Sequence, residues 1–364
     1  MFHFFRNRRR TPLAEIEAER ICLIKPSALG DVIQTLPVLT ALRTRFPNAH
    51  IAWVINRSYA DLLASHPHLN EVIPFERGRG KPWSRAVCRS FAELCESLRQ
   101  RQFDLVCDLQ GLLRSGLLAR ATMAPRRIGL GDAREAARFF FTDVVDVPED
   151  NMSAVDRYWL LVEALGIGSA AKQFVISVEP AIQAWAEGLT AGWSGLRIAI
   201  HAGARWMTKR WPIENFVEIA QRLQREFDVR FVLIGGGDEM AGAHKLESAL
   251  PGRCFNLVGQ TSLKQLAAIL ARVNLLITND SGPMHLAAAV GTSVAALFTC
   301  TSPVRARPYG SGHVILATNI WCAASYLKKC SRMDCMTELT PDRVWLAIRS
   351  KTQQLLAERQ NPAA

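Results

Sequence analysis

The chain has 364 residues, 49% of them hydrophobic, which is enough for two domains that each bury a core. Lysine and arginine number 44 against 33 aspartates and glutamates, and the net charge of +11 favours an anionic partner: nucleic acid, a membrane surface or a phosphorylated substrate. No stretch is apolar for long enough to cross a bilayer, and the start lacks the apolar core of a signal peptide. We therefore expect a cytoplasmic protein whose nine cysteines are reduced thiols.

Short β-rich runs alternate with amphipathic helical runs, which is typical of α/β layering. In the first half, strands are expected at 21–25, 50–55, 71–75, 104–108 and 127–130. Helices are expected at 32–46, 59–65, 90–101, 112–122 and 151–165, and residues 168–194 are interpreted as the region between two domains.

The alternation restarts in the second half, with strands expected at 197–201, 230–234, 254–257, 275–278 and 294–298. Helices are expected at 214–227, 239–250, 262–272, 283–290 and 341–360. This pattern predicts two α/β sheets that face a cleft, with ligands at the carboxyl ends of the strands. The expected parts are a basic tail (1–20), a first domain (21–175), a linker (176–195), a second domain (196–340) and a C-terminal helix (341–364).

Two strand-to-helix junctions are suited to a phosphate. The run TNDSGPMH (278–285) opens a helix, where free N–H groups and the positive end of the helix dipole converge. The run PSALGD (26–31) precedes the first long helix, and its Gly30 permits close approach by a ligand. Asp31 either caps that helix or presents a carboxylate that takes a proton from a substrate hydroxyl, and the motif alone favours the cap.

The segment HAGARWMTKRWP (201–212) combines small residues with two cations. Gly203 leaves room for a ligand, and Lys209 and Arg210 are suited to neutralise a diphosphate unless they form an ordinary solvated loop. In IGGGDE, three glycines follow a strand, but the spacing is not G-x-G-x-x-G, which argues against a nicotinamide nucleotide. Asp238 or Glu239 is suited either to accept hydrogen bonds from ribose hydroxyls or to cap the next helix.

The segment DLQGLLRSG (108–116) places Gln110 and Arg114 at the end of a strand. Together with Arg57, Arg126 and Arg127, they are candidates to line a pocket for an acidic molecule, although each alone is equally consistent with a surface residue.

Two further features favour no definite site. Cys322, Cys330 and Cys335 are irregularly spaced and fall short of a zinc pattern, so no metal is expected. The N-terminal FHFFRNRRR mixes aromatic residues with arginines, which suits either adhesion to an anionic bilayer or a frayed tail.

Four motifs together resemble the glycosyltransferase family 9 heptosyltransferases: KPSALGDVIQTLPVLTALR, HAGARWMTKRWPIENF, LVGQTSLKQLAAIL and TNDSGPMHLAAAVGTSVAALF, in this order. The similarity runs from about Ile21 to the final helix, and KRWP is closer to heptosyltransferase II than to heptosyltransferase I. The resemblance implies a GT-B fold, in which an acceptor-binding and a nucleotide-sugar-binding Rossmann-like domain face a central cleft. It also implies an inverting, metal-independent transfer without a cofactor, from ADP-heptose or a related ADP-sugar to the lipopolysaccharide inner core or another lipid-linked acidic saccharide. Such an enzyme is expected in the cytoplasm, peripheral on the inner membrane.

The resemblance carries roles to particular positions. Asp31 matches the general base, Lys209 the lysine that holds the donor diphosphate, and Glu239 falls near the acid that binds the ribose. The other expected donor-binding residues are Gly203, Arg210, Asp280, Ser281, Gly282 and His285, and the expected acceptor-binding residues are Ser27, Arg57, Gln110 and Arg114. The chain departs from the family at Thr299-Cys300, where a Gly-Pro is frequent, which affects that loop and the selectivity for the donor sugar.

Three other functions compete with this interpretation. An NAD-dependent oxidoreductase would use similar domains, but the dinucleotide fingerprint is missing. A nucleic-acid-binding protein is disfavoured because no recognised RNA or DNA module interleaves its basic and aromatic residues, so no specific nucleic acid is expected. A nucleotide-sugar-binding protein without catalysis is disfavoured by the presence of both Asp31 and Lys209.

Overall fold

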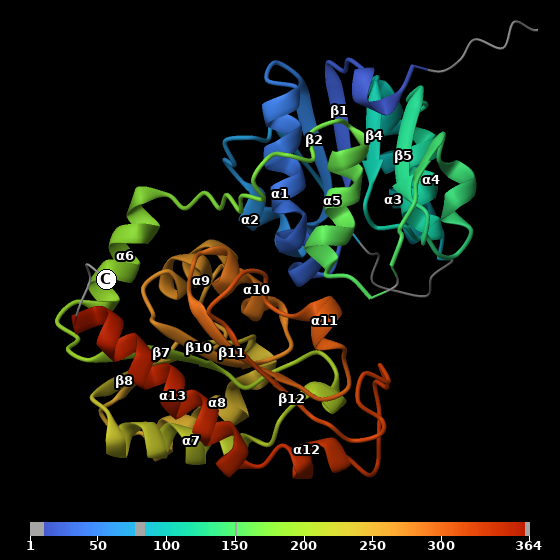
Figure 1. Cartoon of the computed structure of the whole chain (residues 1–364). Coiled ribbons are helices and arrows are strands. Elements are labelled where there is room, and N and C mark those ends of the chain that lie inside the picture. The colour runs from blue at the N-terminus through green and yellow to red at the C-terminus, as the bar shows by residue number, and fades with distance from the viewer. Residues whose placement is uncertain (1–10, 77–83, 150, 361–364) are drawn as a thin grey trace, which may run out of the picture.

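The computed structural model describes residues 11–76, 84–149 and 151–360, which form two α/β halves joined by an extended segment (Figure 1). Each half contains one six-stranded parallel sheet. The expected architecture of two α/β sheets is therefore confirmed. The first ten residues of the expected basic tail and the last four of the expected C-terminal segment lie outside the described residues.

The N-terminal half contains β1 (Arg20–Ile24), β2 (His50–Asn56), β3 (Glu71–Phe75), β4 (Leu105–Asp108), β5 (Arg126–Leu130) and β6 (Asp143–Val145). Its helices are α1 (Leu29–Arg45), α2 (Ala60–Leu63), α3 (Arg85–Gln100), α4 (Leu113–Ala121) and α5 (Ala154–Ala164), with short 3-10 turns η1 (Leu13–Glu15), η2 (Arg57–Tyr59) and η3 (Ala137–Phe140). The strand order is β3-β2-β1-β4-β5-β6.

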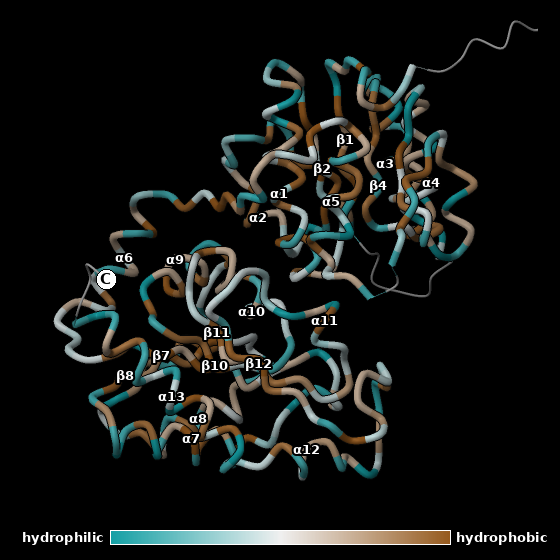
Figure 2. The backbone as a smooth tube through the Cα atoms, viewed as in Figure 1, coloured by the Kyte–Doolittle hydropathy of each residue, from teal (hydrophilic) through white to brown (hydrophobic). Residues whose placement is uncertain are grey.

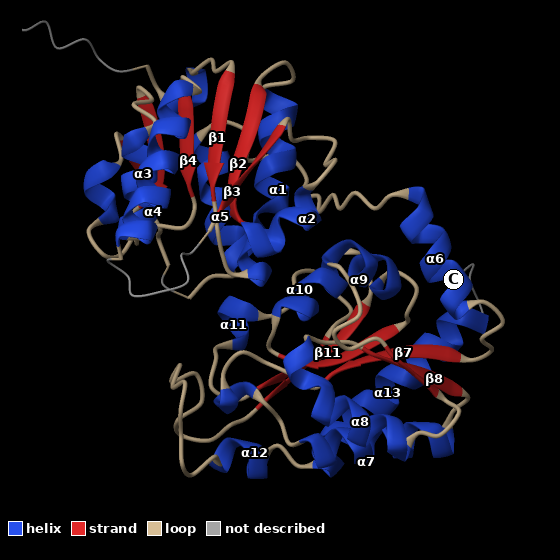
Figure 3. Cartoon of the chain, turned by 180° about the vertical axis from the view of Figure 1, so that it is seen from behind, coloured by secondary structure: helices blue, strands red, loops and turns tan. Residues whose placement is uncertain are grey.

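Successive side chains of the central strands enter different cores, because neighbouring residues of a strand point to opposite faces of the sheet. Along β1, Ile21 and Leu23 belong to the core under α1 and α5, whereas Cys22 and Ile24 belong to the core under α3 and α4. Figures 1 and 3 show these helix pairs on opposite faces of the sheet. Burial on both faces explains why the central strands are mostly apolar, as the colours of Figure 2 show.

The C-terminal half contains β7 (Leu196–His201), β8 (Val229–Leu233), β9 (Cys254–Asn256), β10 (Leu275–Asn279), β11 (Ser293–Phe298) and β12 (Val314–Ala317). Its helices are α6 (Pro180–Thr190), α7 (Ile213–Glu226), α8 (Met240–Ala249), α9 (Leu263–Leu270), α10 (Gly282–Ala289), α11 (Pro303–Ala306), α12 (Asp334–Glu338) and α13 (Pro341–Gln360), with η4 (Met207–Lys209) and η5 (Gly237–Glu239). Its sheet order, β12-β11-β10-β7-β8-β9, repeats that of the first sheet when the strands are counted from β7.

The structure adds elements that the sequence pattern did not predict. β6 and β12 complete the sheets at one edge each and have only three and four residues, too few for a clear periodicity. Helix α6 lies within the range 176–195 that was interpreted as a linker, and it packs against α9. Within the described ranges, no helix combines the length and the apolarity that a membrane span requires.

This topology fixes where a ligand can bind. In both sheets the strand order reverses between the first and fourth strands, at β1/β4 and at β7/β10. The crevice outside the carboxyl ends of two such strands is the usual binding place in open parallel sheets. The loops after β4, β7 and β10 carry Gln110, Gly203 and Asp280, and Asp31 lies in the first turn of α1, the helix that follows β1.

Candidate active site between the two halves

Asp31 lies at the third position of α1, immediately after the turn that follows β1. Its Oδ2 accepts the N–H of Ala28 at 3.1 Å, so the carboxylate does cap the helix. Its Oδ1 accepts the hydroxyl of Tyr158, on α5, at 2.9 Å. Each carboxylate oxygen therefore has one donor, which fixes the orientation of the group and leaves further lone pairs for a ligand.

Charge and hydrogen bonding keep Asp31 ionised. Burial alone would raise the pKa of Asp31, but the Lys25 ammonium and the hydrogen bonds from Ala28 and Tyr158 outweigh it and hold the pKa below its ordinary value. Lys25 is itself buried, donates to the carbonyl of Leu109 at 3.0 Å and lies 4.6 Å from the centre of the Tyr158 ring. Sequence reasoning singled out neither Lys25 nor Tyr158.

In the C-terminal half, Lys209 and Asp280 form an ion pair beside the start of α10. Lys209 Nζ donates to Asp280 Oδ2 at 2.6 Å, and the hydroxyl of Thr301 donates to the same oxygen at 2.6 Å. Asp280 is buried, so it holds the ammonium in place. An ammonium has three N–H donors, and since Asp280 provides the acceptor recorded among the described residues, two donors remain for a ligand at the N-terminus of the helix.

A chain of polar contacts runs from α10 to the glycine-rich turn after β8. Ser281 Oγ lies 3.0 Å from His201 Nδ1, and His201 Nε2 lies 3.2 Å from Glu239 Oε2. Burial would raise the pKa of Glu239, but the contact with His201 and the N–H of Gly236 hold it below its ordinary value. His201 is the last residue of the strand expected at 197–201, but sequence reasoning assigned it no role.

Glu239 also explains why position 203 is a glycine. A Cβ on Gly203 would overlap the carboxylate of Glu239, and one on Gly235 would also meet it. The two loops therefore approach so closely that only glycine fits. Gly203 leaves room for the Glu239 carboxylate of the same half.

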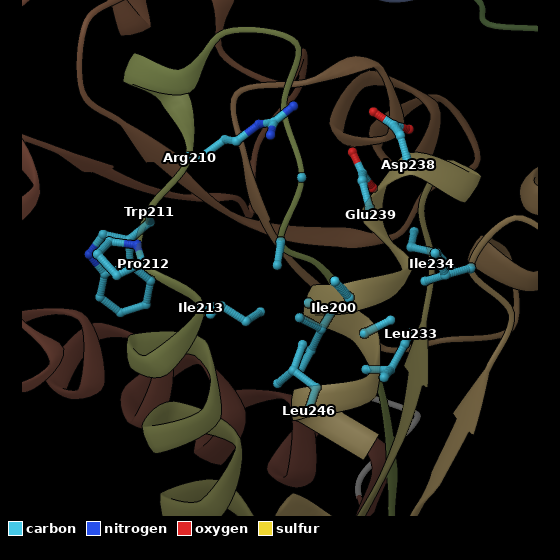
Figure 4. A pocket seen from close by; sticks show the side chains of 16 residues that line it. Ile200, Arg210, Trp211, Pro212, Ile213, Leu233, Ile234, Asp238, Glu239 and Leu246 are labelled. Carbon is cyan, nitrogen blue, oxygen red and sulfur yellow. The ribbon is translucent and has the colours of Figure 1, made fainter. Parts of the chain in front are cut away.

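A cavity of about 350 Å³ lies next to Glu239, between the starts of α7 and α8. Figure 4 shows Arg210, Asp238 and Glu239 grouped at one end and aliphatic side chains such as Ile213 and Leu246 deeper inside. The guanidinium of Arg210 donates to the carbonyl of Ala204 at 2.6 Å. An apolar cavity of this size with polar groups at one end suits part of a small ligand.

The two halves meet where α1 and α10 begin. A Cβ on Gly30 would overlap the imidazole of His285, and one on Gly282 would lie 2.8 Å from the side chain of Leu29. Burial lowers the pKa of His285, the carboxylates of Asp280 and Asp31 raise it, and Lys209 lowers it further. Charged groups of both halves thus affect the pKa of the buried His285 imidazole. The Nδ1 of this ring has no hydrogen-bond partner among the described residues.

Contacts at two other places also join the halves. Lys264 on α9 donates to the carbonyl of Ala64 at 2.7 Å. Tyr309 donates its hydroxyl to Asp156 on α5 at 3.0 Å. The two halves therefore also contact each other on either side of the place where α1 meets α10.

The expected acceptor-binding residues fall into two groups. The N–H of Ser27 donates to Gln110 Oε1 at 3.3 Å, so this pair lies beside the turn that carries Asp31. Arg57 forms an ion pair with Glu76, and Arg114 lies 5.8 Å from the centre of the Phe75 ring, so both arginines lie near the end of β3.

The expectation that Arg126 joins this group is wrong. Arg126 is the first residue of β5 and pairs with Asp143 at 2.9 Å. It therefore lies at the amino ends of the strands, whereas the expected site lies at their carboxyl ends. Arg127 also lies near the amino ends of the strands, where its side chain donates to the carbonyl of Phe140 at 2.9 Å. In the described ranges, no three histidine, cysteine or acidic side chains are arranged to hold a metal ion.

Comparison with known proteins extends this picture. The family model described as glycosyltransferase family 9 (heptosyltransferase) matches residues 91–336. The chain is 26% identical over 303 residues to the lipopolysaccharide core heptosyltransferase OpsX of Haemophilus influenzae, which covers 82% of this chain and 84% of that protein. It is 28% identical over 367 residues to the lipopolysaccharide heptosyltransferase 1 of Pseudomonas aeruginosa, which covers 89% and 96%.

Solved structures agree in fold. A family 9 glycosyltransferase from Veillonella parvula has a TM-score of 0.80 at 25% identity, over 92% of this chain and 98% of that one. The E. coli heptosyltransferase WaaC with ADP has a TM-score of 0.74 at 24% identity, over 91% and 99%.

Proposed function

Because the chain belongs to glycosyltransferase family 9 (heptosyltransferase), we propose that it transfers a heptose from ADP-heptose to the inner core of lipopolysaccharide. The names of its relatives give a heptosyltransferase activity to those proteins, and one solved neighbour holds an ADP-heptose analogue. The observation that carries the proposal is the junction of the two halves of this GT-B fold: Gly30, next to Asp31, lies against His285 of α10, and Lys209 pairs with Asp280 just before that helix.

The C-terminal half is suited to hold the donor. The two free N–H groups of the Lys209 ammonium and the N-terminus of α10 would bind the diphosphate. Glu239 would accept hydrogen bonds from the ribose hydroxyls, with Arg210 beside it and the apolar cavity for the base. Because these groups already place positive charge where the leaving diphosphate develops negative charge, we propose that the transfer needs no metal ion and no cofactor.

The N-terminal half would supply the base. The ionised Asp31 would take the proton of an acceptor hydroxyl while that oxygen forms its bond to the anomeric carbon of the heptose. The bond from this carbon to the β-phosphate oxygen breaks at the same time, and ADP leaves with the electron pair. One displacement with base and leaving group on opposite sides inverts the anomeric carbon.

The acceptor would lie against the N-terminal half. Ser27 and Gln110 are next to Asp31 and would contact the saccharide near the reacting hydroxyl. Arg57 and Arg114 lie near the end of β3 and would bind acidic groups more distant from it. We also propose that the protein works in the cytoplasm at the inner membrane, because a lipid-linked acceptor resides there.

A donor screen tests the proposal. Purified protein is incubated with a delipidated inner-core acceptor and with ADP-heptose, ADP-glucose or UDP-glucose, and free nucleotide is measured over time. We expect nucleotide release that depends on the acceptor with ADP-heptose, unchanged by EDTA, and a product of inverted anomeric configuration by NMR. Release from another donor alone would contradict ADP-heptose as the donor. Retention of configuration would contradict the inverting displacement, and loss of activity in EDTA would contradict a metal-independent transfer.

An NAD-dependent oxidoreductase is the second candidate, because both sheets have the strand order of dinucleotide-binding domains. Against it, the glycine-rich turn after β8 already receives the carboxylate of Glu239, which approaches Gly203 and Gly235. A carboxylate at this point would repel a pyrophosphate. Titration with NADH, followed by its fluorescence, is expected to show no saturable binding.

A further inference from the structure

A group of exposed apolar side chains lies on α4, directly after it and on η3. Phe139 is 88% exposed, Met123 53%, Leu113 41% and Leu117 38%. Single exposed apolar residues are ordinary, but neighbouring ones mark an interaction surface. We call these four residues, with Arg120, Arg134 and Arg138, the α4–η3 patch.

The two elements that carry most of the patch, α4 and η3, pack against each other. Leu113, Leu117 and Arg120 recur at helical spacing on the exposed side of α4. A Cβ on Gly116 would lie 2.8 Å from the ring of Phe140, so η3 packs tightly onto α4. The guanidinium of Arg120 lies 2.7 Å from the sulfur of Met123.

The charge around these apolar side chains is mainly positive. Arg120, Arg134 and Arg138 are exposed, whereas the acidic residue of this turn, Glu135, accepts the N–H of Leu113 at 3.3 Å. None of the three arginines has an ion pair among those that the described residues form. Their positive charge is therefore available to an anionic partner.

The patch is continuous with the proposed acceptor side. Helix α4 begins after the loop from the carboxyl end of β4, the end of the sheet where Asp31 lies. The N–H of Arg134 donates to the carbonyl of Gly111 at 2.8 Å, and its charge contributes to lowering the pKa of Lys25. Figures 1 and 3 show α4 on the side of the molecule away from α6.

We propose that the α4–η3 patch docks on an anionic phospholipid bilayer, with its leucines and Phe139 in the headgroup region and its arginines on the lipid phosphates. This inference rests on the proposed function, because a lipid-linked acceptor must be reached at a membrane surface. Docking through this patch would bring the acceptor saccharide to the mouth of the site. Charge complementarity and continuity with the site favour lipid over a second protein.

Vesicle co-sedimentation of the full chain tests the proposal. Wild-type protein should bind vesicles that contain phosphatidylglycerol and bind pure phosphatidylcholine only weakly. An arginine near an anionic leaflet contributes about 1 kcal/mol, or about a fivefold change in partition, so the Arg120→Ser/Arg138→Ser variant should lose about 25-fold at low salt. Phe139→Ser should weaken binding several-fold, and this loss should persist at high salt because it is not electrostatic.

Matched substitutions on the far side of the C-terminal half serve as controls. Leu346 on α13 is 69% exposed, and Arg225 on α7 is also exposed. Leu346→Ser and Arg225→Ser should bind vesicles like the wild type. Equal losses in these controls, wild-type binding by the patch variants, or a dimer that Phe139→Ser dissociates would each overturn the proposal.

Activity with a delipidated acceptor separates this proposal from the proposed function. Patch variants should transfer heptose to that acceptor at the wild-type rate and lose activity only on acceptor embedded in vesicles. If the wild type transferred no heptose while vesicle binding still depended on the patch, the proposed function would fail and the docking surface would stand. If transfer proceeded but the patch variants kept full activity on embedded acceptor, the docking surface would fail alone.

Discussion

Replacing Tyr158 by phenylalanine removes one of the hydrogen bonds that keep Asp31 ionised, while the ring that faces Lys25 stays in place. A hydrogen bond to a charged group is worth about 1.5–3 kcal/mol. Because this hydrogen bond stabilises the carboxylate and not the neutral acid, its loss would raise the pKa of Asp31. Asp31 is partly exposed, so water replaces some of the lost interaction and offsets part of this rise.

The sign of the effect follows from the direction of the shift. The hydroxyl stabilises the charged form of Asp31 and lowers its pKa, so its removal makes the carboxylate take up a proton at higher pH. The single-turnover rate of transfer, measured against pH with saturating ADP-heptose, should begin its acidic decline at a higher pH in Tyr158→Phe than in the wild type. At neutral pH the two rates should differ little.

Tyr309→Phe is the matched control, because Tyr309 also donates to an aspartate, Asp156, at 3.0 Å, away from the turn that carries Asp31. This variant should keep the wild-type pH profile. An acidic limb that stays in place or moves to lower pH in Tyr158→Phe would refute the reasoning. So would an equal shift in Tyr309→Phe.

Three further substitutions test the two halves and their junction. Lys209→Ala should weaken ADP binding in calorimetry and slow transfer by about 10²–10³-fold. Lys328→Ala removes the other ammonium beside the Trp206 ring and should change ADP binding and transfer little. Equal effects of the two substitutions would contradict the role assigned to Lys209. Gly203→Ala should displace the neighbouring carboxylate and raise the KM for donor, and an unchanged KM would count against the ribose site. Gly30→Ala should obstruct the imidazole of the other half, so kcat should fall while the Kd for ADP stays the same, and a normal kcat would contradict the junction.

Periodicity was enough to predict most of the fold. The central strands are apolar because both of their faces are buried, and α13 has the bounds that its pattern predicted, Pro341–Gln360. The edge strands β6 and β12 escaped prediction because short strands with partly exposed side chains resemble loops. Their place in the sheet depends on neighbours that are distant in sequence.

The candidate site was predictable where one turn carries the chemistry and not where distant segments meet. Asp31 and Asp280 come soon after strands, and these strand-to-helix junctions could be recognised from local sequence. The partner of Asp31, Tyr158, is 127 residues away, and nothing near Tyr158 marks it as part of the site. The buried His285 lies against Gly30, a contact that depends on the docking of the two halves.

The most direct test of the central claim, that Asp31 removes the acceptor proton while the other half holds the donor, is a paired measurement on Asp31→Asn. Asparagine can still accept the N–H of Ala28, so the cap of α1 is retained. We expect calorimetry to give a Kd for ADP within about twofold of the wild type, and single-turnover transfer to fall by about 10²–10⁴-fold. Transfer near the wild-type rate, or a loss fully explained by weaker ADP binding, would contradict the claim.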